Sequence, residues 1–587
     1  EKLGEYDGAI EDFGKAIELD SEDTDALYHR GLSLLALEKY DLAIEDFGRA
    51  IELDPTLYEN YYERGVAEEK LGEYDGAAID FGKAIELDSE DTDPLYHRGL
   101  SLLALEKYDL AIEDFGRAIE LNPTLSENYY ERGIAKEKLG EYDGAIEDFG
   151  KAIELNSKHD GAYFERGVAK KELGEYGGAA NDFGRAIELN SDDTEAYLIR
   201  GLISVELKDW NQAIEDLSVY IRSEPGQSET YYKRGVSYGE LGQYDLAIED
   251  FGRAIELDSH IAEVYYDRSL SYIKLEDYKN AIEDLDRVIE MDPEIKDAFY
   301  ERGVVNLNTG KYDLAIEDLD RAIKLDCNLA KAYYNRGLAE SKLGKNDLAL
   351  KDFGIAIELD PDNTEAYIVR GITLMSLGEY DKATNNFEKV IECGNESGSA
   401  YLNIGLAHLR LLMHENAIED FGRAIELEPS MVDAYYNRGL SFNEQKNYYR
   451  AIEDFDMALY LDSGLFGAYY NRGIALLSLG KDDLAIGDFL RAIEADPDSK
   501  VSGKSYYFRG ISYAKLGKYE LAIEDFDSAI EVDPDLTDVY YNRALAYYKL
   551  GKYELAIEDF DSAIEVDPDL TDVYYNRALA YYKLGKY

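Results

Sequence analysis

The segment KYELAIEDFDSAIEVDPDLTDVYYNRALAYYKLG occupies residues 518–551 and recurs without a change at residues 552–585. It defines a period of 34 residues, and periods of about 20–50 residues indicate repeat arrays. The frame covers the whole sequence: a half repeat at 1–23, sixteen repeats at 24–570 with a three-residue insertion at 500–502, and a half repeat at 571–587. The sequence therefore predicts one continuous array.

Each repeat contains two apolar patterns of helical period. In the copy that starts near Val539, the first pattern ends on Gly551, a residue suited to a left-handed C-terminal cap. The second pattern begins at Tyr553 and stops before Pro568, which cannot continue a helix. Each repeat therefore predicts a pair of short helices joined by a tight turn.

Seven positions recur at this period, represented by Tyr540, Ala544, Tyr547, Ala556, Phe560, Ala563 and Pro568. They match the signature of the tetratricopeptide repeat (TPR) family, which the sequence resembles over its whole length. The resemblance implies an all-α fold, in which 34-residue helix-turn-helix repeats stack into a right-handed superhelical solenoid with a concave groove. The sequence departs from the family at position 7 of the repeat, where Arg543 and its equivalents replace the usual leucine.

Charged residues recur inside the array. The position 7 arginine is present in sixteen of seventeen copies and is lost at Ile404, and an aspartate in the second helix is present in sixteen of seventeen and is lost at Asn386. If each aspartate pairs with the arginine of the following repeat, one missing pair explains both losses, whereas pairing within a repeat leaves two defects. We therefore expect structural ion pairs between repeats. The predicted pairs include Asp250 with Arg268 and Asp318 with Arg336.

Composition limits the classes of function. With 62 Lys and Arg against 124 Asp and Glu, the formal charge of −62 disfavours binding to nucleic acid and to anionic membrane surfaces. No apolar run reaches the roughly 18 residues of a membrane-spanning helix, so we expect no membrane insertion. The six histidines and two cysteines show no metal-ligand or nucleophile spacing. The sequence predicts a protein that is not an enzyme and has no cofactor or metal.

In the TPR family, positions 2, 5, 6, 9, 12 and 13 of the repeat line the groove. Carried over to this sequence, position 5 gives a series of tyrosines, whereas position 6 is His or Glu in the early repeats and mostly Asn in the late ones. The asparagines could hydrogen-bond the backbone of an extended ligand, or they could lie on a solvated helix face. The predicted groove residues are Tyr232, Tyr266, Tyr300, Tyr334, Asn335, Asn403, Tyr436, Asn437, Tyr470, Asn471, Tyr541 and Asn542.

These patterns favour a non-catalytic scaffold that binds extended or helical segments of partner proteins, with basic segments favoured by charge. The alternative is a self-assembling structural protein, since near-identical copies lengthen an array without building a unique site. The sequence starts in the tail of a first helix and stops after a first helix, so head-to-tail stacking into a homo-oligomer or filament would continue the array. The same ends are expected if the sequence is part of a longer chain.

Two repeats diverge from the rest, one around Trp210 and one around Met413. Together with the insertion at 500–502 they are candidates for kinks or docking sites, or for tolerated drift.

Overall fold

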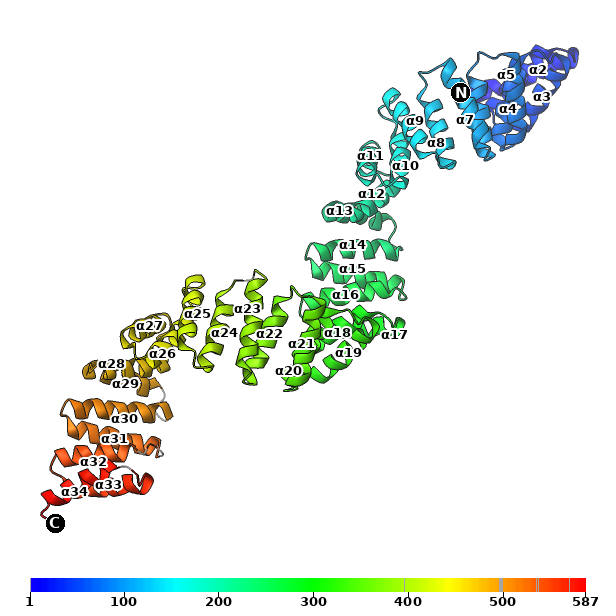
Figure 1. The fold of residues 1–587 in the computed structure, drawn as a ribbon. Coiled ribbons are helices and arrows are strands. Elements are labelled where there is room, and N and C mark those ends of the chain that lie inside the picture. Colours follow the sequence, from blue (N-terminus) through cyan, green and yellow to red (C-terminus); the bar gives the residue numbers. More distant parts are fainter. Residues whose placement is uncertain are drawn as a thin grey trace. The chain divides into compact units, whose positions relative to one another are not determined.

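The computed structural model describes residues 2–394, 396–495, 500–534, 536, 538–569 and 571–586. Within these residues, all regular secondary structure is helical. The chain divides into two compact units, Glu1–Pro293 and Glu294–Tyr587, and each is described by itself. In each unit every helix packs against the next one along the chain, as Figure 1 shows. The predicted all-α stack of helix pairs is confirmed, whereas its right-handed superhelix and its continuity over the whole chain stay predictions.

The first unit contains α1 (Lys2–Leu19), α2 (Thr24–Ala36), α3 (Tyr40–Leu53), α4 (Tyr58–Leu71), α5 (Tyr74–Leu87), α6 (Asp93–Ala104), α7 (Tyr108–Leu121), α8 (Ser126–Lys138), α9 (Tyr142–Leu155), α10 (Asp160–Glu172), α11 (Tyr176–Leu189), α12 (Thr194–Glu206), α13 (Trp210–Ser223), α14 (Ser228–Glu240), α15 (Tyr244–Leu257), α16 (Ala262–Lys274) and α17 (Tyr278–Met291).

The second unit contains α18 (Lys296–Asn308), α19 (Tyr312–Leu325), α20 (Ala330–Lys342), α21 (Asn346–Leu359), α22 (Thr364–Ser376), α23 (Tyr380–Glu392), α24 (Gly398–Arg410), α25 (His414–Leu427), α26 (Val432–Glu444), α27 (Tyr448–Leu461), α28 (Phe466–Ser478), α29 (Asp482–Ala495), α30 (Lys500–Lys515), α31 (Tyr519–Val532), α32 (Asp538–Lys549), α33 (Tyr553–Val566) and α34 (Thr571–Lys583).

Small residues let the two helices of a repeat approach closely. Gly337 of α20 lies so near α21 that a β-carbon there would be 2.7 Å from Cε1 of Phe353. Phe353 is fully buried, as are its equivalents in most repeats, and Ala349 one turn earlier is also fully buried. The recurring Gly, Ala and Phe therefore form the seam between first and second helices, which explains their fixed spacing in the sequence.

The irregular repeats keep the regular helix pattern. The helices that begin at Trp210 and at His414, the residue after Met413, each span 14 residues, like their counterparts elsewhere. The insertion lies at the start of α30, which is lengthened to 16 residues and begins at Lys500. The insertion is therefore absorbed as extra helix, and a kink at any of these three places stays a prediction.

The position 7 arginines form ion pairs inside their own repeats. Arg234 of α14 donates from Nε and Nη2 to the two carboxylate oxygens of Asp250 in α15, both at 2.7 Å. Arg268 is bound in the same way by Asp284. Fourteen such pairs, with shortest N–O distances of 2.5–2.7 Å, join residues 16 positions apart in the described part of the chain. The predicted pair of Asp250 with Arg268 is therefore wrong.

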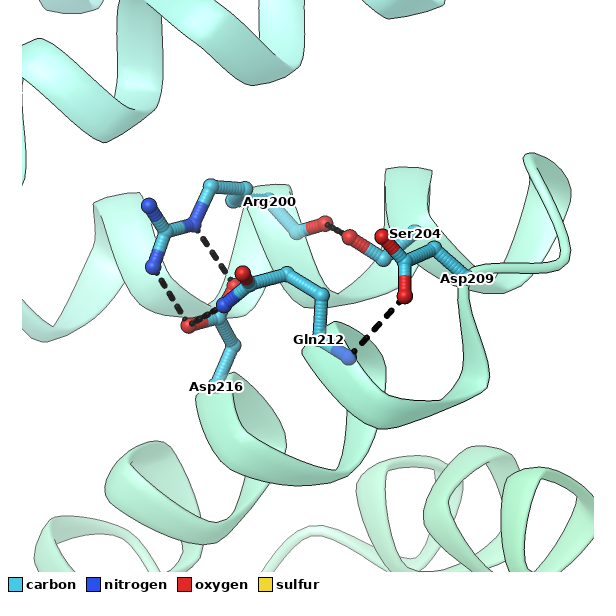
Figure 2. Close-up of polar contacts among 5 residues, drawn as sticks. All are labelled: Arg200, Ser204, Asp209, Gln212 and Asp216. Carbon is cyan, nitrogen blue, oxygen red and sulfur yellow. Dashed lines mark hydrogen bonds and ion pairs between the residues drawn. The ribbon is translucent and has the colours of Figure 1, made fainter. Parts of the chain in front are cut away.

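Figure 2 shows one of these pairs, in which Arg200 and Asp216 face each other across the two helices of one repeat. Gln212, one turn before Asp216, donates a further hydrogen bond to the same carboxylate. The position 4 aromatic ring lies beside the guanidinium, with Tyr197 centred 5.9 Å from Cζ of Arg200. The Arg200 guanidinium is thus held by a carboxylate and an aromatic side chain of its own repeat, and the same two contacts recur at Arg268 and Arg543.

A contact to the preceding repeat does exist, but it uses a different aspartate. Arg336 binds Asp352 of its own repeat, and its remaining Nη1 donates to Asp320 of the preceding one at 2.5 Å. Asp318, the predicted partner of Arg336, instead binds Arg302. The two aspartates are two positions apart on one helix, so they point to different sides of it and reach arginines of different repeats.

We expect a double-mutant cycle to separate the two pairings. Asp250→Asn should lower the local unfolding free energy of α14–α15 by about 3–5 kcal/mol, because it leaves the Arg234 guanidinium half-buried without its carboxylate. Coupling should be large between changes at Asp250 and Arg234 and near zero between changes at Asp250 and Arg268. Hydrogen exchange of the α14–α15 amides measures both quantities. Strong coupling to Arg268 would contradict the pairing within the repeat.

Candidate functional site

All twelve predicted groove residues are half-buried. Five of the seven tyrosines pack on core phenylalanines of their own repeats, with ring centroids about 6 Å apart in pairs such as Tyr232–Phe251 and Tyr436–Phe455. In the repeats of Tyr266 and Tyr300 the core residue is a leucine. Where position 6 of the next repeat is polar, the hydroxyl groups of Tyr232, Tyr300, Tyr436 and Tyr541 reach that side chain. Tyr232 donates to Asp267 at 2.8 Å, and Tyr436 accepts from Asn471 at 3.2 Å. The tyrosine series therefore joins successive first helices and is not a free stacking surface.

The asparagines also serve the scaffold. Nδ2 of Asn335 donates to the Tyr300 hydroxyl and to the carbonyl of Lys331, so both of its hydrogens are used. Asn542 makes the same two contacts, to Tyr507 and to Asp538. Position 5 of the preceding repeat is not a tyrosine in the case of Asn403 and Asn437. Within the described part of the chain, these two asparagines donate only to the backbone carbonyl one turn earlier. The carbonyl oxygen is the part of these amides left to bind a peptide backbone, and such binding stays a prediction.

The first unit has acidic groups at the equivalent positions, a feature that the sequence analysis noted but did not include in the site. Burial raises the pKa of Glu131 in α8 to about 7. Burial, together with the neighbouring charge of Glu137, raises the pKa of Glu165 in α10 to about 7. One oxygen of Glu137 is buried without a hydrogen-bond partner. None of these three carboxylates has a salt bridge to a cation among the described residues, and the charge of Lys138 offsets their burial only in part, at Glu137 and Glu165. They form an acidic cluster, called here the Glu131–Glu137–Glu165 cluster.

A neighbouring pair of repeats shows which kind of side chain can pair with an acid at these positions. Residues 28 apart meet across successive first helices, and there Glu69 contacts Nδ1 of His97 at 2.9 Å. The Glu137–Glu165 contact has the same spacing but places two acids together. A further groove cavity of about 310 Å³ lies between α14 and α16, lined by Val236, Glu240, Asp267 and Lys274 among others.

The two substituted positions of the ion-pair series lie in separate repeats. Arg370 of α22 faces Asn386 of α23 and donates from Nε to its Oδ1 at 2.6 Å. Asp420, which would face Ile404, is instead bound by Nδ1 of His408 at 2.6 Å. The single-defect explanation of the sequence is therefore wrong, because Asp420 has gained a new partner one helical turn beyond Ile404. Arg370 has gained no carboxylate.

The comparisons with known proteins agree with this arrangement. A model described as tetratricopeptide repeat matches residues 24–57, 93–125, 126–159, 228–260, 330–363 and 432–465. Two further models with that description match 58–91, 364–392, 398–431 and 466–499, and 164–228 and 266–327. A model described as TPR repeat matches 2–38, 510–551 and 545–585. The chain belongs to the tetratricopeptide repeat family. No curated protein matches this TPR chain.

Solved structures similar to this TPR chain include YrrB, a TPR protein with an unusual peptide-binding site, at 28% identity and a TM-score of 0.30, covering 31% of this chain and 95% of YrrB. A MamA structure is 27% identical with a TM-score of 0.28, covering 29% of this chain and 92% of MamA. Yeast Tom70 is 19% identical with a TM-score of 0.29, covering 72% of this chain and 96% of Tom70.

The described residues contain no group of three or more His, Cys, Asp or Glu side chains arranged to hold a metal ion. No helix among them combines the length and the apolar character needed to cross a bilayer.

We expect Asn386→Asp to stabilise the repeat formed by α22 and α23. An aspartate there would accept from both Nε and Nη2 of Arg370, as in the other repeats, and a charged hydrogen bond is worth about 1.5–3 kcal/mol. Hydrogen exchange of the α22–α23 amides should show greater protection. Asn385→Asp adds the same charge at an exposed neighbour and should change little. Equal protection in both variants would contradict the role given to Arg370.

We expect the stability of α8–α10 to fall as pH rises from about 4.5 to 7. The ordinary pKa of a glutamate is 4.5, and that of folded Glu131 is about 7. In that window the folded state holds a proton that the unfolded state has lost, so raising pH favours unfolding. Glu131→Gln should remove part of this dependence and stabilise the region at pH 8 by an amount on the order of 1 kcal/mol. Hydrogen exchange at pH 5 and pH 8, corrected for intrinsic rates, measures it, and an unchanged pH slope would contradict it.

Proposed function

We propose that this TPR protein is a protein-interaction scaffold whose first unit holds a lysine or arginine side chain of an extended partner segment at the Glu131–Glu137–Glu165 cluster. The observation that carries the proposal is the cluster itself, which gathers half-buried carboxylates that have no salt bridge among the described residues and only the more distant charge of Lys138 to offset them. Burying such groups costs free energy unless a partner charge offsets it. A cation from a ligand would supply that charge.

The neighbouring contacts support a ligand of this sign. Where the chain itself provides a basic group at the same spacing, as at His97, the acid binds it directly. The cluster occupies positions 6 and 12 of its repeats, which are groove positions in the TPR family. The formal charge of −62 adds a long-range attraction for basic segments, which raises association rates and weakens with salt. The scaffold function needs no catalytic group.

The filament remains the alternative from the sequence. No contact described above favours it, so it stays a prediction.

We expect a labelled Lys- and Arg-rich peptide to bind the full chain more tightly than an acidic peptide of equal length, as measured by fluorescence anisotropy. The double variant Glu131→Gln, Glu165→Gln should weaken binding of the basic peptide by roughly tenfold or more, since charged hydrogen bonds are lost. Binding should also tighten from pH 6 to pH 8, because a bound cation favours the ionised carboxylates and releases their protons.

The matched control is Glu147→Gln, which removes the same charge from an exposed position of α9. It should reduce affinity only slightly, through long-range charge. Equal losses in both variants would show that the net charge of the chain, and not the cluster, attracts the peptide. Equal binding of basic and acidic peptides would overturn the proposal.

A further inference from the structure

Arg370 differs from the other arginines of its series in its surroundings. In the described repeats, an arginine at position 7 has a carboxylate at position 23 of its own repeat, and some also have one at position 25 of the preceding repeat. For Arg370 these two places are held by Asn386 and Gly354. Both carboxylates that can neutralise this guanidinium are therefore absent.

The contacts of Arg370 leave most of its donors without an anion. Its Nε donates to Asn386, whose own Nδ2 donates to the carbonyl of Lys382 at 2.7 Å, so the amide is already engaged. At Gly354, the position of a β-carbon lies 3.8 Å from Nη1 of Arg370. At the equivalent place in another repeat, Asp456 accepts from Nη1 of Arg472 at 2.5 Å. No described carboxylate forms an ion pair with Arg370. Burial lowers the pKa of Arg370, and the charges of Tyr367 and Glu358 oppose this only in part, whereas hydrogen bonds to two aspartates raise the pKa of Arg336.

A cavity of about 570 Å³ adjoins this guanidinium between α21, α22 and α23. Its lining carries three cations, Arg370, Lys382 and Lys389, and one carboxylate, Glu379. The lysines stand at the exposed rim, where Lys382 lies 2.5 Å from Glu379 and Lys389 pairs with Glu392. The lining includes none of the Tyr and Asn residues of the groove. The cleft is therefore a separate, positively charged site in a strongly acidic chain.

The equivalent cavity beside Arg234 shows the usual balance. It is lined by three arginines and by three carboxylates, one of which is Asp250 bound to Arg234. Two differences separate the sites: Asn386 stands where Arg234 meets Asp250, and Gly354 stands where Nη1 of Arg234 donates to the hydroxyl of Ser218 at 2.9 Å. The first difference removes the carboxylate that would pair with Arg370. The missing group is a carboxylate of known geometry, one that meets the Nε–Nη2 edge or the Nη1 atom of the arginine.

We propose that the cleft at Arg370 binds a carboxylate side chain from an acidic segment of a partner protein. The carboxylate would accept from Nη1 and Nη2 of Arg370, with Lys382 and Lys389 attracting it at the rim and Leu350, Tyr367 and Leu374 packing on its aliphatic stem. A singly charged carboxylate replaces the missing aspartate charge for charge. The site is independent of the basic-segment site proposed for the first unit.

The test is anisotropy of a fluorescein-labelled peptide of alternating Glu and Gly, with the full chain in about 0.15 M salt to screen its net charge. Asn386→Asp supplies the missing carboxylate from within, so it should weaken binding about tenfold or more. Asn385→Asp lines the same cavity and adds the same charge without reaching into the ion-pair position, so it should have a much smaller effect.

A second variant tests the proposal by creating a binding site in another repeat, so the test does not rest only on weaker peptide binding by Asn386→Asp. Asp454 binds Arg438, and position 25 of the preceding repeat is Gly422, so Asp454→Asn leaves the Arg438 guanidinium without a carboxylate at both places, as at Arg370. The rim of that repeat has Arg450 in place of Lys382 and Met457 in place of Lys389, so we expect a weaker site. The variant should add this second binding site for the same peptide. Equal affinity of the wild-type chain and Asn386→Asp would overturn the proposal. Inorganic phosphate that binds while the peptide does not would also overturn it, by showing a phosphate site instead.

Discussion

The stacking of this chain depends on an arginine placed between two successive second helices. Its guanidinium meets a carboxylate of its own repeat on one edge and, where position 25 is aspartate, a carboxylate of the preceding repeat on the other. Burial raises the pKa of Asp250 and of Asp454 although each binds an arginine, so desolvation outweighs attraction there. Such pairs add little net stability over an apolar contact. Incorrect packing of the helices, however, leaves a buried charge without its partner, and that costs free energy. The pairs therefore act mainly by penalising incorrect packing of the two helices within a repeat and, where position 25 is aspartate, incorrect stacking on the preceding repeat.

Most of the fold could be predicted from the sequence because the period is explicit and each helix carries its own signals. Glycine at the turn, alanine and phenylalanine at the seam, and proline after the second helix all lie where the structure uses them. The pairing of charges could not be predicted in the same way. In a strict repeat, an aspartate such as Asp250 lies 16 positions after one arginine and 18 before the next, and the pattern of residues is the same for both pairings. The direction of the side chain decides, and sequence does not show it.

The substitutions at Ile404 and Asn386 led to the wrong pairing, because one missing pair is a simpler explanation of them than two separate defects. One unpaired position was corrected by a substitution elsewhere in the repeat, since His408 binds Asp420 from one turn further along α24. The groove was predicted with similar limits. Family positions identified the tyrosines and asparagines, but the hydroxyl groups and amide hydrogens are largely used between successive first helices, as at Tyr300 and Asn335. The acidic cluster could have been predicted from Glu137 and Glu165, which stand 28 residues apart, the spacing at which Glu69 meets His97.

In an array of repeats with the same ion pairs, a binding site can arise where one repeat lacks a partner charge. The net charge of −62 suggests repulsion of every anion, yet at physiological salt a charge is felt over only about 8 Å. The lining of the Arg370 cleft carries three cations and one carboxylate, whereas a group near the Glu131–Glu137–Glu165 cluster meets mainly acids. Local geometry can therefore give one chain sites of opposite sign, while the total charge sets only how fast partners arrive. A scaffold of nearly identical repeats becomes selective through the few positions at which its own charges are not paired.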